Sequence, residues 1–301
     1  MPSTPVFENP WRFESNPEVY LLVAFLIGAY VYSIRVLGPK AVVGTDMVVA
    51  KRSNKLAFTG AMMLLFAAST WPIHQISEQY LYSAHMLQHM MLSYFMPPLV
   101  LLATPEWLFR VLVGNGRAYR ILGFFCRPIQ AALIFNAVVM ITHIPGMVNA
   151  STTNPLLHYS LHLTLVITAL GMWMPILGPF PEWHMSDAAK PIYLFLQSVV
   201  PTVPAGWLTF AEGVVYKRYN QPVRIWNISV IDDQQLAGAI MKIGGSVFLW
   251  CFVVFYFFKR FAPNWKEENT YRREPLTYDQ VHQAFQQSDA PIESQATASR
   301  E

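Results

Sequence analysis

The segment Tyr80–Leu102 is the strongest constraint on the fold, because it is long enough to cross a bilayer and yet carries two histidines. Its sequence, YLYSAHMLQHMMLSYFMPPLVLL, places His85 and His89 four residues apart. Imidazoles at this spacing share one helix face and can bind one ion. The same spacing recurs at His158 and His162, at the start of another apolar segment. We therefore expect helices that carry histidine pairs into an apolar environment.

Composition indicates a membrane protein. Hydrophobic residues make up 53% of the 301 residues and charged residues only 13%, and the charges lie almost wholly between the apolar segments. Seven segments approach the roughly 20 residues that a spanning helix needs: Val19–Leu37, Leu56–Ile73, Tyr80–Ala103, Pro128–Ile144, Leu156–Leu177, Pro191–Phe210 and Leu236–Phe258. The predicted fold is an all-α membrane protein with a seven-helix bundle over residues 19–258. Residues 1–18 form a short extracytoplasmic segment, and residues 259–301 a polar, largely disordered cytoplasmic tail.

Lys and Arg in the connecting segments predict the orientation. They concentrate in the first and third connections and after the last span, and they are absent from His74–Gln79 and Pro145–Asn154. Because positively charged residues are retained on the cytoplasmic side, we predict that the amino terminus lies outside and the carboxyl terminus in the cytoplasm. The sixth connection carries Lys217, Arg218 and Arg224 and argues against this orientation, but the bias of the other connections is larger.

This orientation gathers histidines near the outer face. Six of the eight lie in the outer half of the membrane or at its outer surface: His74, His85, His89, His143, His158 and His162. Polar groups cost free energy in hydrocarbon, so this clustering favours a shared metal or haem over separate interhelical hydrogen bonds. Met86 and Met90 repeat the four-residue spacing, and thioether sulfur favours Cu(I). We predict a metal site formed by these six histidines with Met86 and Met90, and copper is the preferred metal.

Other polar residues in the apolar segments have simpler interpretations. Asp232 and Asp233 are expected to cap the last spanning helix, whereas Glu78 or Glu212 could orient a histidine ligand. Lys242 lies inside the last span, where a lysine is a functional candidate that could pair with an acid or extend to the surface. Both cysteines, Cys126 and Cys251, are expected to be buried small hydrophobic residues.

Five motifs together resemble one family. They are SAHMLQHMML at Ser83–Leu92, MPPLVLLATP at Met96–Pro105, THIPGMVNAS at Thr142–Ser151, NPLLHYSLHL at Asn154–Leu163 and WMPILGPFPE at Trp173–Glu182. They are similar to the multi-spanning CtaG family of bacterial assembly factors for caa(3)-type cytochrome c oxidases. The resemblance implies a multi-pass protein of the bacterial plasma membrane that is needed to make an active haem-copper oxidase, and it points to the handling of copper. The histidine motifs of the family correspond to His85, His89, His143, His158 and His162.

The resulting hypothesis is a non-catalytic assembly factor that binds copper near the outer face and helps to load a metal centre of the oxidase. Its expected partners are oxidase subunits and the lipid bilayer, with no nucleic acid. Three alternatives remain open: a membrane cytochrome with a bis-His haem, a copper transporter, and a metal-free scaffold for an assembling subunit. Below Met91 the third span shows no polar path to the cytoplasm, which disfavours a transporter.

Overall fold

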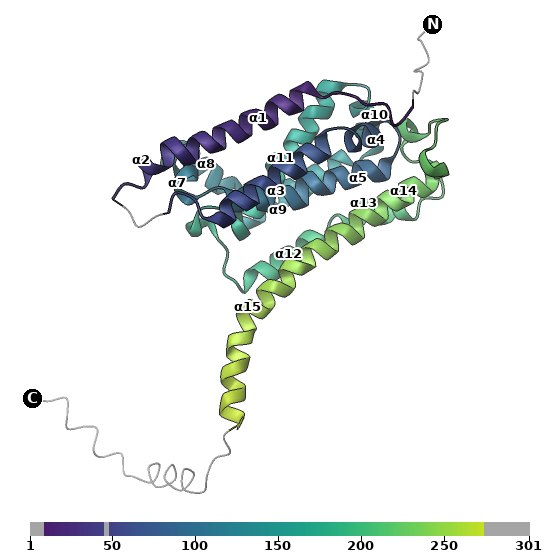
Figure 1. Ribbon diagram of the computed structural model, residues 1–301. Helices are drawn as coiled ribbons and strands as arrows, with labels where there is room; N and C mark the ends of the chain where they lie inside the picture. The colour runs from purple at the N-terminus through teal and green to yellow at the C-terminus, as the bar shows by residue number, and fades with distance from the viewer. Residues whose placement is uncertain (1–8, 45–47, 274–301) are drawn as a thin grey trace, which may run out of the picture. The chain divides into compact units, whose positions relative to one another are not determined.

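The computed structural model describes residues 9–44 and 48–273, with side chains described as far as residue 260. All regular secondary structure in this part of the chain is helical, which confirms the predicted all-α class (Figure 1). In chain order the α-helices are α1 (Pro17–Tyr32), α2 (Gly38–Ala41), α3 (Arg52–Ser69), α4 (Ile73–Gln79), α5 (Tyr82–Met90), α6 (Met96–Ala103), α7 (Glu106–Val113), α8 (Arg117–Phe125), α9 (Pro128–Thr142), α10 (Pro145–Ser151), α11 (Pro155–Leu177), α12 (Ala189–Val199), α13 (Thr202–Thr209), α14 (Val230–Ala239) and α15 (Gly245–Arg273).

Five helical segments among the described residues are long and apolar enough to cross a membrane: Pro17–Ala41, Tyr82–Ala103, Pro155–Leu177, Ala189–Thr209 and Val230–Arg260. Two bent pairs pass the same test together, α3 with α4 at 43° and α8 with α9 at 68°. The described chain therefore has five such helices, or up to seven if each bent pair is one span. The predicted count of seven and the predicted orientation stay predictions.

Both bends occur next to a proline. Pro72 lies between the end of α3 and the start of α4, and it cannot donate a backbone hydrogen bond that would continue the helix. Pro128 is the first residue of α9, a position that suits its fixed φ and missing N–H. Each bend lies at an edge of a predicted segment: Pro72 is near the end of the second, and Pro128 begins the fourth.

Residues 1–256 form one compact unit and residues 257–301 a second. Within the first unit, α5 packs against both α4 and α14, and α11 packs against α6 and α9. Three short π-helical turns lie within the spanning segments: Ser33–Leu37, Met91–Phe95 and Ile240–Gly244. The turn at Met91–Phe95 ends two residues before Pro97, and Pro97 and Pro98 remove two donors from the helical hydrogen-bonding pattern. The segment Tyr82–Ala103 nevertheless remains one span.

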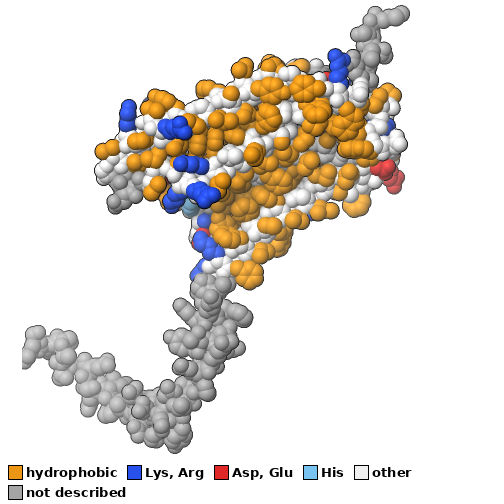
Figure 2. Space-filling model, in the orientation of Figure 1, with side chains coloured by type: hydrophobic (Ala, Val, Ile, Leu, Met, Phe, Trp, Pro, Cys, Tyr) orange, Lys and Arg blue, Asp and Glu red, His pale blue; other side chains and the backbone are white. Residues whose placement is uncertain are grey.

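The surface of the first unit matches a membrane environment. Hydrophobic side chains cover most of the face drawn in Figure 2, and Lys and Arg gather toward the end at which α2, α7 and α8 lie. Large apolar side chains such as Leu21 and Phe25 of α1 are about 70% exposed, as expected for residues that contact lipid. Cys126 is buried but Cys251 is exposed on α15, so the prediction that both are buried is wrong for Cys251. Its weakly polar thiol is compatible with an apolar surface.

The second unit contains the end of α15, which continues as far as Arg273. The first part of the segment predicted as a disordered tail, residues 259–301, is therefore helical. Residues 274–301 lie outside the described part of the chain, as do residues 1–8 of the predicted extracytoplasmic segment.

Candidate metal centre

The first histidine pair lies on α5. The rings of His85 and His89 have centroids 4.4 Å apart, as their spacing of one helical turn predicts. The start of α5 is fixed by Asp233 of α14, whose carboxylate accepts hydrogen bonds from the backbone amides of Tyr82 (2.8 Å) and Ser83 (3.1 Å). A carboxylate satisfies amides that have no partner within the helix and complements the helix dipole. Asp233 thus positions the helix that carries the first pair.

The two neighbouring acids of α14 have different roles. Ser229 caps α14 by accepting a hydrogen bond from the backbone amide of Asp232 at 3.1 Å, and the Ser229 hydroxyl donates to the Asp232 carboxylate. Asp233 is fully buried and its carboxylate binds the start of α5 instead. Neither acid therefore caps α14 as predicted: Ser229 is the cap, Asp232 accepts a hydrogen bond from the Ser229 hydroxyl, and Asp233 binds the start of α5.

The second histidine pair lies on the first two turns of α11. Asn154 caps this helix, since its side-chain oxygen accepts a hydrogen bond from the backbone amide of Leu157 at 3.2 Å. The rings of His158 and His162 follow on one face, with centroids 4.4 Å apart. The cap and the proline at the first helical position set where α11 begins, and thereby the depth at which both rings lie.

The two pairs meet between α5 and α11. The ring of His162 has its centroid 4.9 Å from that of His89 and 5.7 Å from that of His85. One potential ligand atom from each of His85, His89 and His162 lies within 4.8 Å of the others. A second group, formed by Glu78, His158 and His162, meets the same limit. His162 belongs to both groups, so the groups form one cluster, which we call the histidine cluster.

The donor atoms of the histidine cluster fit a metal ion. The Nε2 atoms of His89 and His162 are buried and have no hydrogen-bond partner among the described residues. Nearly all buried polar atoms in proteins are hydrogen-bonded, so such atoms are available as ligands. Both residues line a cavity of about 20 Å³, a size that suits a single ion or water. Imidazole nitrogen with one carboxylate is a donor set for copper, zinc or iron.

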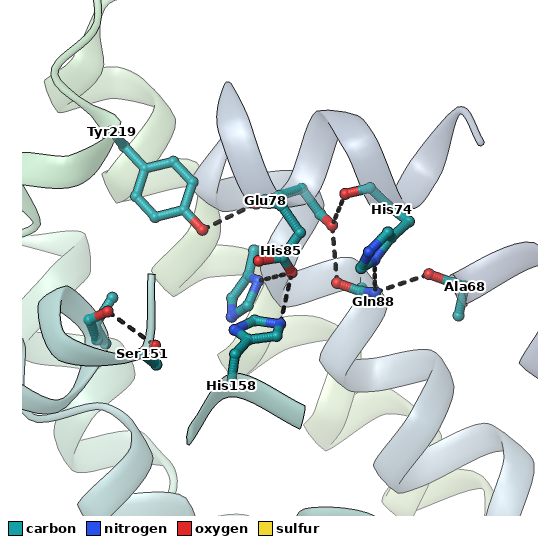
Figure 3. A network of polar contacts seen from close by, with 10 residues as sticks. Ala68, His74, Glu78, His85, Gln88, Ser151, His158 and Tyr219 are labelled. Carbon is teal, nitrogen blue, oxygen red and sulfur yellow. Dashed lines mark hydrogen bonds and ion pairs between the residues drawn. The ribbon is translucent and has the colours of Figure 1, made fainter. Parts of the chain in front are cut away.

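Glu78 of α4 joins the two pairs. Its Oε1 atom lies 3.1 Å from Nε2 of His158 and 3.4 Å from Nδ1 of His85, as Figure 3 shows. These are ion-pair distances, but neither contact has hydrogen-bond geometry, since Oε1 of Glu78 and Nδ1 of His85 have no hydrogen-bond partner in the described chain. The carboxylate therefore lies where it could either orient both rings or bind an ion directly.

A loop residue supports Glu78. The hydroxyl of Tyr219 donates a hydrogen bond to the backbone carbonyl of Ser77 at 2.9 Å (Figure 3). Burial raises the pKa of Tyr219 well above its usual value, so this hydroxyl stays protonated and remains a donor at neutral pH. The ring of Tyr219 also packs against Tyr82 with centroids 5.0 Å apart. The loop between α13 and α14 thereby covers the cluster and holds α4 in place.

His143 lies at the end of α9, next to the histidine cluster. Its ring centroid is 6.0 Å from that of His89, and its Nε2 atom lies 3.4 Å from the sulfur of Met86. Met90 lines a second cavity of about 20 Å³ together with His89 and His143. These predicted site residues are therefore near the histidine cluster, although neither metal-capable group found among the described residues includes His143.

His74 lies apart from these groups. Its Nδ1 atom is 3.2 Å from Nε2 of Gln88, which also donates a hydrogen bond to the backbone carbonyl of Ala68 at 2.8 Å (Figure 3). Since an amide nitrogen can only donate, Nδ1 of His74 is the acceptor. This contact gives His74 a structural role between α3, α4 and α5.

Lys242 lies on the π-helical turn before α15, and in the described part of the chain it contacts neither an acid nor a histidine. Its ammonium group donates hydrogen bonds to the hydroxyl of Thr202 at 2.5 Å and to the backbone carbonyl of Ser198 at 3.4 Å. It thus links the last span to α12 and α13. This contact differs from both expectations for Lys242, an acidic partner or extension to the surface.

Sequence reasoning did not identify three residues that shape the site. The sequence pattern marks neither Tyr219 nor Met241, and it favours the wrong helix for Asp233. The contacts of Tyr219 and Asp233 join segments 142 and 151 residues apart. No local pattern marks such residues, although an acid next to a helix start in a membrane protein could have prompted a search for a second helix start.

A comparison with known proteins identifies the family of the chain. A family model described as cytochrome c oxidase caa3 assembly factor (Caa3_CtaG) matches residues 23–262, which is most of the chain. No curated protein and no solved structure matches it. The matched range includes every helix that contributes to the histidine cluster. The chain therefore belongs to the caa3-type cytochrome c oxidase assembly factor family.

Proposed function

We propose that this assembly factor binds copper at the histidine cluster and helps to load a metal centre of its oxidase, without catalysing a reaction itself. The observation that carries the proposal is the pair of buried, unpartnered Nε2 atoms of His89 and His162 beside a cavity of ionic size. Haem-copper oxidases require copper, and neutral imidazole is a good ligand for it. His85 supplies the third nitrogen, while Glu78 and His158 supply a second set of donors at the same place.

The geometry also suits delivery of the ion. His85, His89 and His162 make a site of few ligands, and His158 and Glu78 are only partly buried. Few ligands and partial access allow an ion to enter and leave, whereas a closed four-ligand cage would retain it. In the predicted orientation these residues lie near the outer face of a bacterial plasma membrane. Lys and Arg gather at the end of the molecule where α2, α7 and α8 lie, and positively charged residues are retained on the cytoplasmic side, which supports this orientation.

The deciding experiment compares the detergent-purified protein with a His85→Ala, His89→Ala variant. We expect bound copper in the wild-type protein, its loss in the variant, and reduced oxidase activity in cells that carry the variant. His282→Ala is the matched control, because this histidine lies outside the described residues and outside all predicted spans. Equal membrane amounts of the three proteins exclude failed insertion. Full oxidase activity with a metal-free wild-type protein would contradict the proposal and indicate a scaffold.

A membrane cytochrome is the second candidate function. A largely apolar cavity of about 530 Å³ lies between α1, α3, α6 and α11, and His74, His158 and His162 are among its lining residues. Cavities of several hundred Å³ can hold large organic ligands, and haem is bound by such histidines. The optical spectrum of the same preparation separates the two candidates, since a haem protein has an intense Soret band and a copper-binding protein has none.

A further inference from the structure

The backbone of α9 determines which nitrogen of His143 carries the proton. Nδ1 of His143 lies 2.6 Å from the backbone carbonyl of Val139, and a carbonyl oxygen can only accept a hydrogen bond. Nδ1 is therefore the protonated nitrogen, and in the neutral ring Nε2 presents a lone pair. His143 is only 6% exposed and lies among spanning helices, where a charged ring without an acidic partner would be costly.

The lone pair of His143 Nε2 faces the lone pairs of a methionine sulfur. Nε2 of His143 lies 3.4 Å from the sulfur of Met86, a thioether that carries no proton. Met86 is only 2% exposed, so the contact between the two atoms is shielded from solvent. Two buried electron-pair donors at this distance gain nothing from each other, but a cation bound by both would be stabilised.

The contact adjoins a cavity with further soft donors. This inner cavity of about 20 Å³ is lined by Met86, Met90, Met241, His89 and His143, among others. Thioether sulfur prefers Cu(I) to harder divalent ions, and imidazole also binds Cu(I). The outer cavity beside His85 and His162 has no methionine in its lining. The two cavities therefore differ in the chemistry of their donors.

His89 connects the two cavities because it lines both. Its ring centroid is 4.9 Å from that of His162 on one side and 6.0 Å from that of His143 on the other. An ion held by His85, His89 and His162 could exchange His162 for His143 and Met86 while remaining bound to His89. Such a step exchanges ligands only, so the ion keeps its charge and no electron acceptor is required.

We propose that the chain holds a second, inner position for Cu(I), formed by His143 Nε2 and the sulfur of Met86 with thioethers of Met90 and Met241 beside them, and filled from the histidine cluster through His89. This inference rests on the proposed copper function and deepens it: the protein binds two ions in different ligand environments. The inner position selects Cu(I), whereas the outer one binds Cu(I) through imidazole and also accepts divalent ions.

The test is an anaerobic titration of the purified full-length protein with Cu(I) against a chromophoric Cu(I) chelator. We expect two ions per wild-type chain and one per chain in a Met86→Leu, Met241→Leu variant. We also expect one per chain in a His85→Ala, His162→Ala variant, since these residues do not line the inner cavity. Met91→Leu is the control, because Met91 is buried in a separate cluster with Ala61 and Leu92. Exchange of Met for Leu conserves volume and is well tolerated.

X-ray absorption of the copper-loaded proteins supplies a second readout. Sulfur scattering is expected in the wild type and in the His85→Ala, His162→Ala variant, and its loss is expected in the Met86→Leu, Met241→Leu variant. Two ions and unchanged sulfur scattering in the methionine variant would overturn the inner position and leave the proposed function intact. The inner position would also be overturned, with the proposed function intact, if the wild type bound one ion and only the His85→Ala, His162→Ala variant lost it. A wild type without copper would overturn the proposed function itself.

Discussion

The histidine cluster and the charged network between α7, α8 and the short turn Pro181–Trp183 are both polar, but they differ in how completely their groups are paired. In the charged network, Arg110 binds Glu106 at 2.7 Å and Glu182 at 3.0 Å. Tyr119 donates to Glu182 at 3.2 Å, and the indole nitrogen of Trp183 donates to Tyr119 at 3.1 Å. Arg110, Tyr119 and Trp183 thus each donate to an acceptor within the network.

The histidine cluster has the opposite character. It lies among spanning helices, where unpaired polar atoms are most costly, yet Nε2 of His89 and Nε2 of His162 have no partner in the described chain. A polar network that satisfies itself needs no ligand to be stable, so its role is structural. A network that leaves buried ring nitrogens unpaired, while its potential ligand atoms lie within 4.8 Å of one another, is arranged for a ligand. The comparison predicts different responses to mutation in the two regions.

His162→Ala is expected to have the largest effect, because His162 is the ligand common to both metal-capable groups. Its loss leaves two donors in each group, and we expect copper affinity to fall by at least about 100-fold, beyond the 10- to 100-fold typical of outer-shell changes. Titration with copper measures this. His184→Ala is the control, since its Nε2 atom contacts the Gly178 carbonyl in a loop away from the cluster. Unchanged affinity in His162→Ala would remove the distinction between the two regions.

Glu78→Gln sharpens the comparison, because it keeps the size of the side chain and removes its charge. If the carboxylate orients His85 and His158, we expect copper affinity to fall by about 10- to 100-fold. Copper titration of Glu78→Gln beside Glu212→Gln, an acid in the loop after α13, provides the measurement. A wild-type copper affinity in both variants would show that Glu78 neither binds the ion nor orients its histidine ligands.

The sequence predicts what is local about the cluster. The pairing of His85 with His89 and of His158 with His162 follows from the helical period, and the apolar context of both pairs predicts that they lie between helices, where His85 is buried and the other three are partly buried. Pro72 and Pro145 follow the ends of α3 and α9 and predict where these helices stop, whereas the bend before Pro128 is not predicted. All of these features depend on residues within one or two turns of each other.

What the sequence could not supply is the set of contacts that join distant segments. Asp233 binds the start of α5, 150 residues away along the chain, although its position also suits a cap of its own helix. His74 resembles the other outer histidines in sequence, but it lies on α4 and contacts Gln88 of α5. Met241 enters the inner cavity only through the packing of the last span. The free energy of these contacts depends on tertiary geometry, which no period or propensity encodes.

Arg110→Ala tests the other side of the comparison. The Arg110 side chain is 39% exposed, so water screens its ion pairs, and we expect the free energy of unfolding to fall by no more than about 1 kcal/mol. Copper affinity should not change, because the network lies on other helices than the histidine cluster. Thermal unfolding together with copper titration measures both quantities, with Arg117→Ala on α8 as a control of equal charge. Loss of copper binding in Arg110→Ala would mean that the two regions are coupled.

The smallest expected effect is the pH dependence of this network. Hydrogen bonding to its own backbone, and then to Arg110, lowers the pKa of Glu182 below its usual value. A carboxyl group with a lowered pKa in the folded state stabilises the fold fully above its unfolded pKa of about 4.3, and this contribution is lost as the pH falls through the lower folded value. The stability difference between wild type and Glu182→Gln should therefore be constant from neutral pH to about pH 5 and shrink in more acidic solution. A difference that stays constant into that acidic range would show that Glu182 contributes by packing rather than by charge, and the contrast with the histidine cluster would then rest on hydrogen bonding alone.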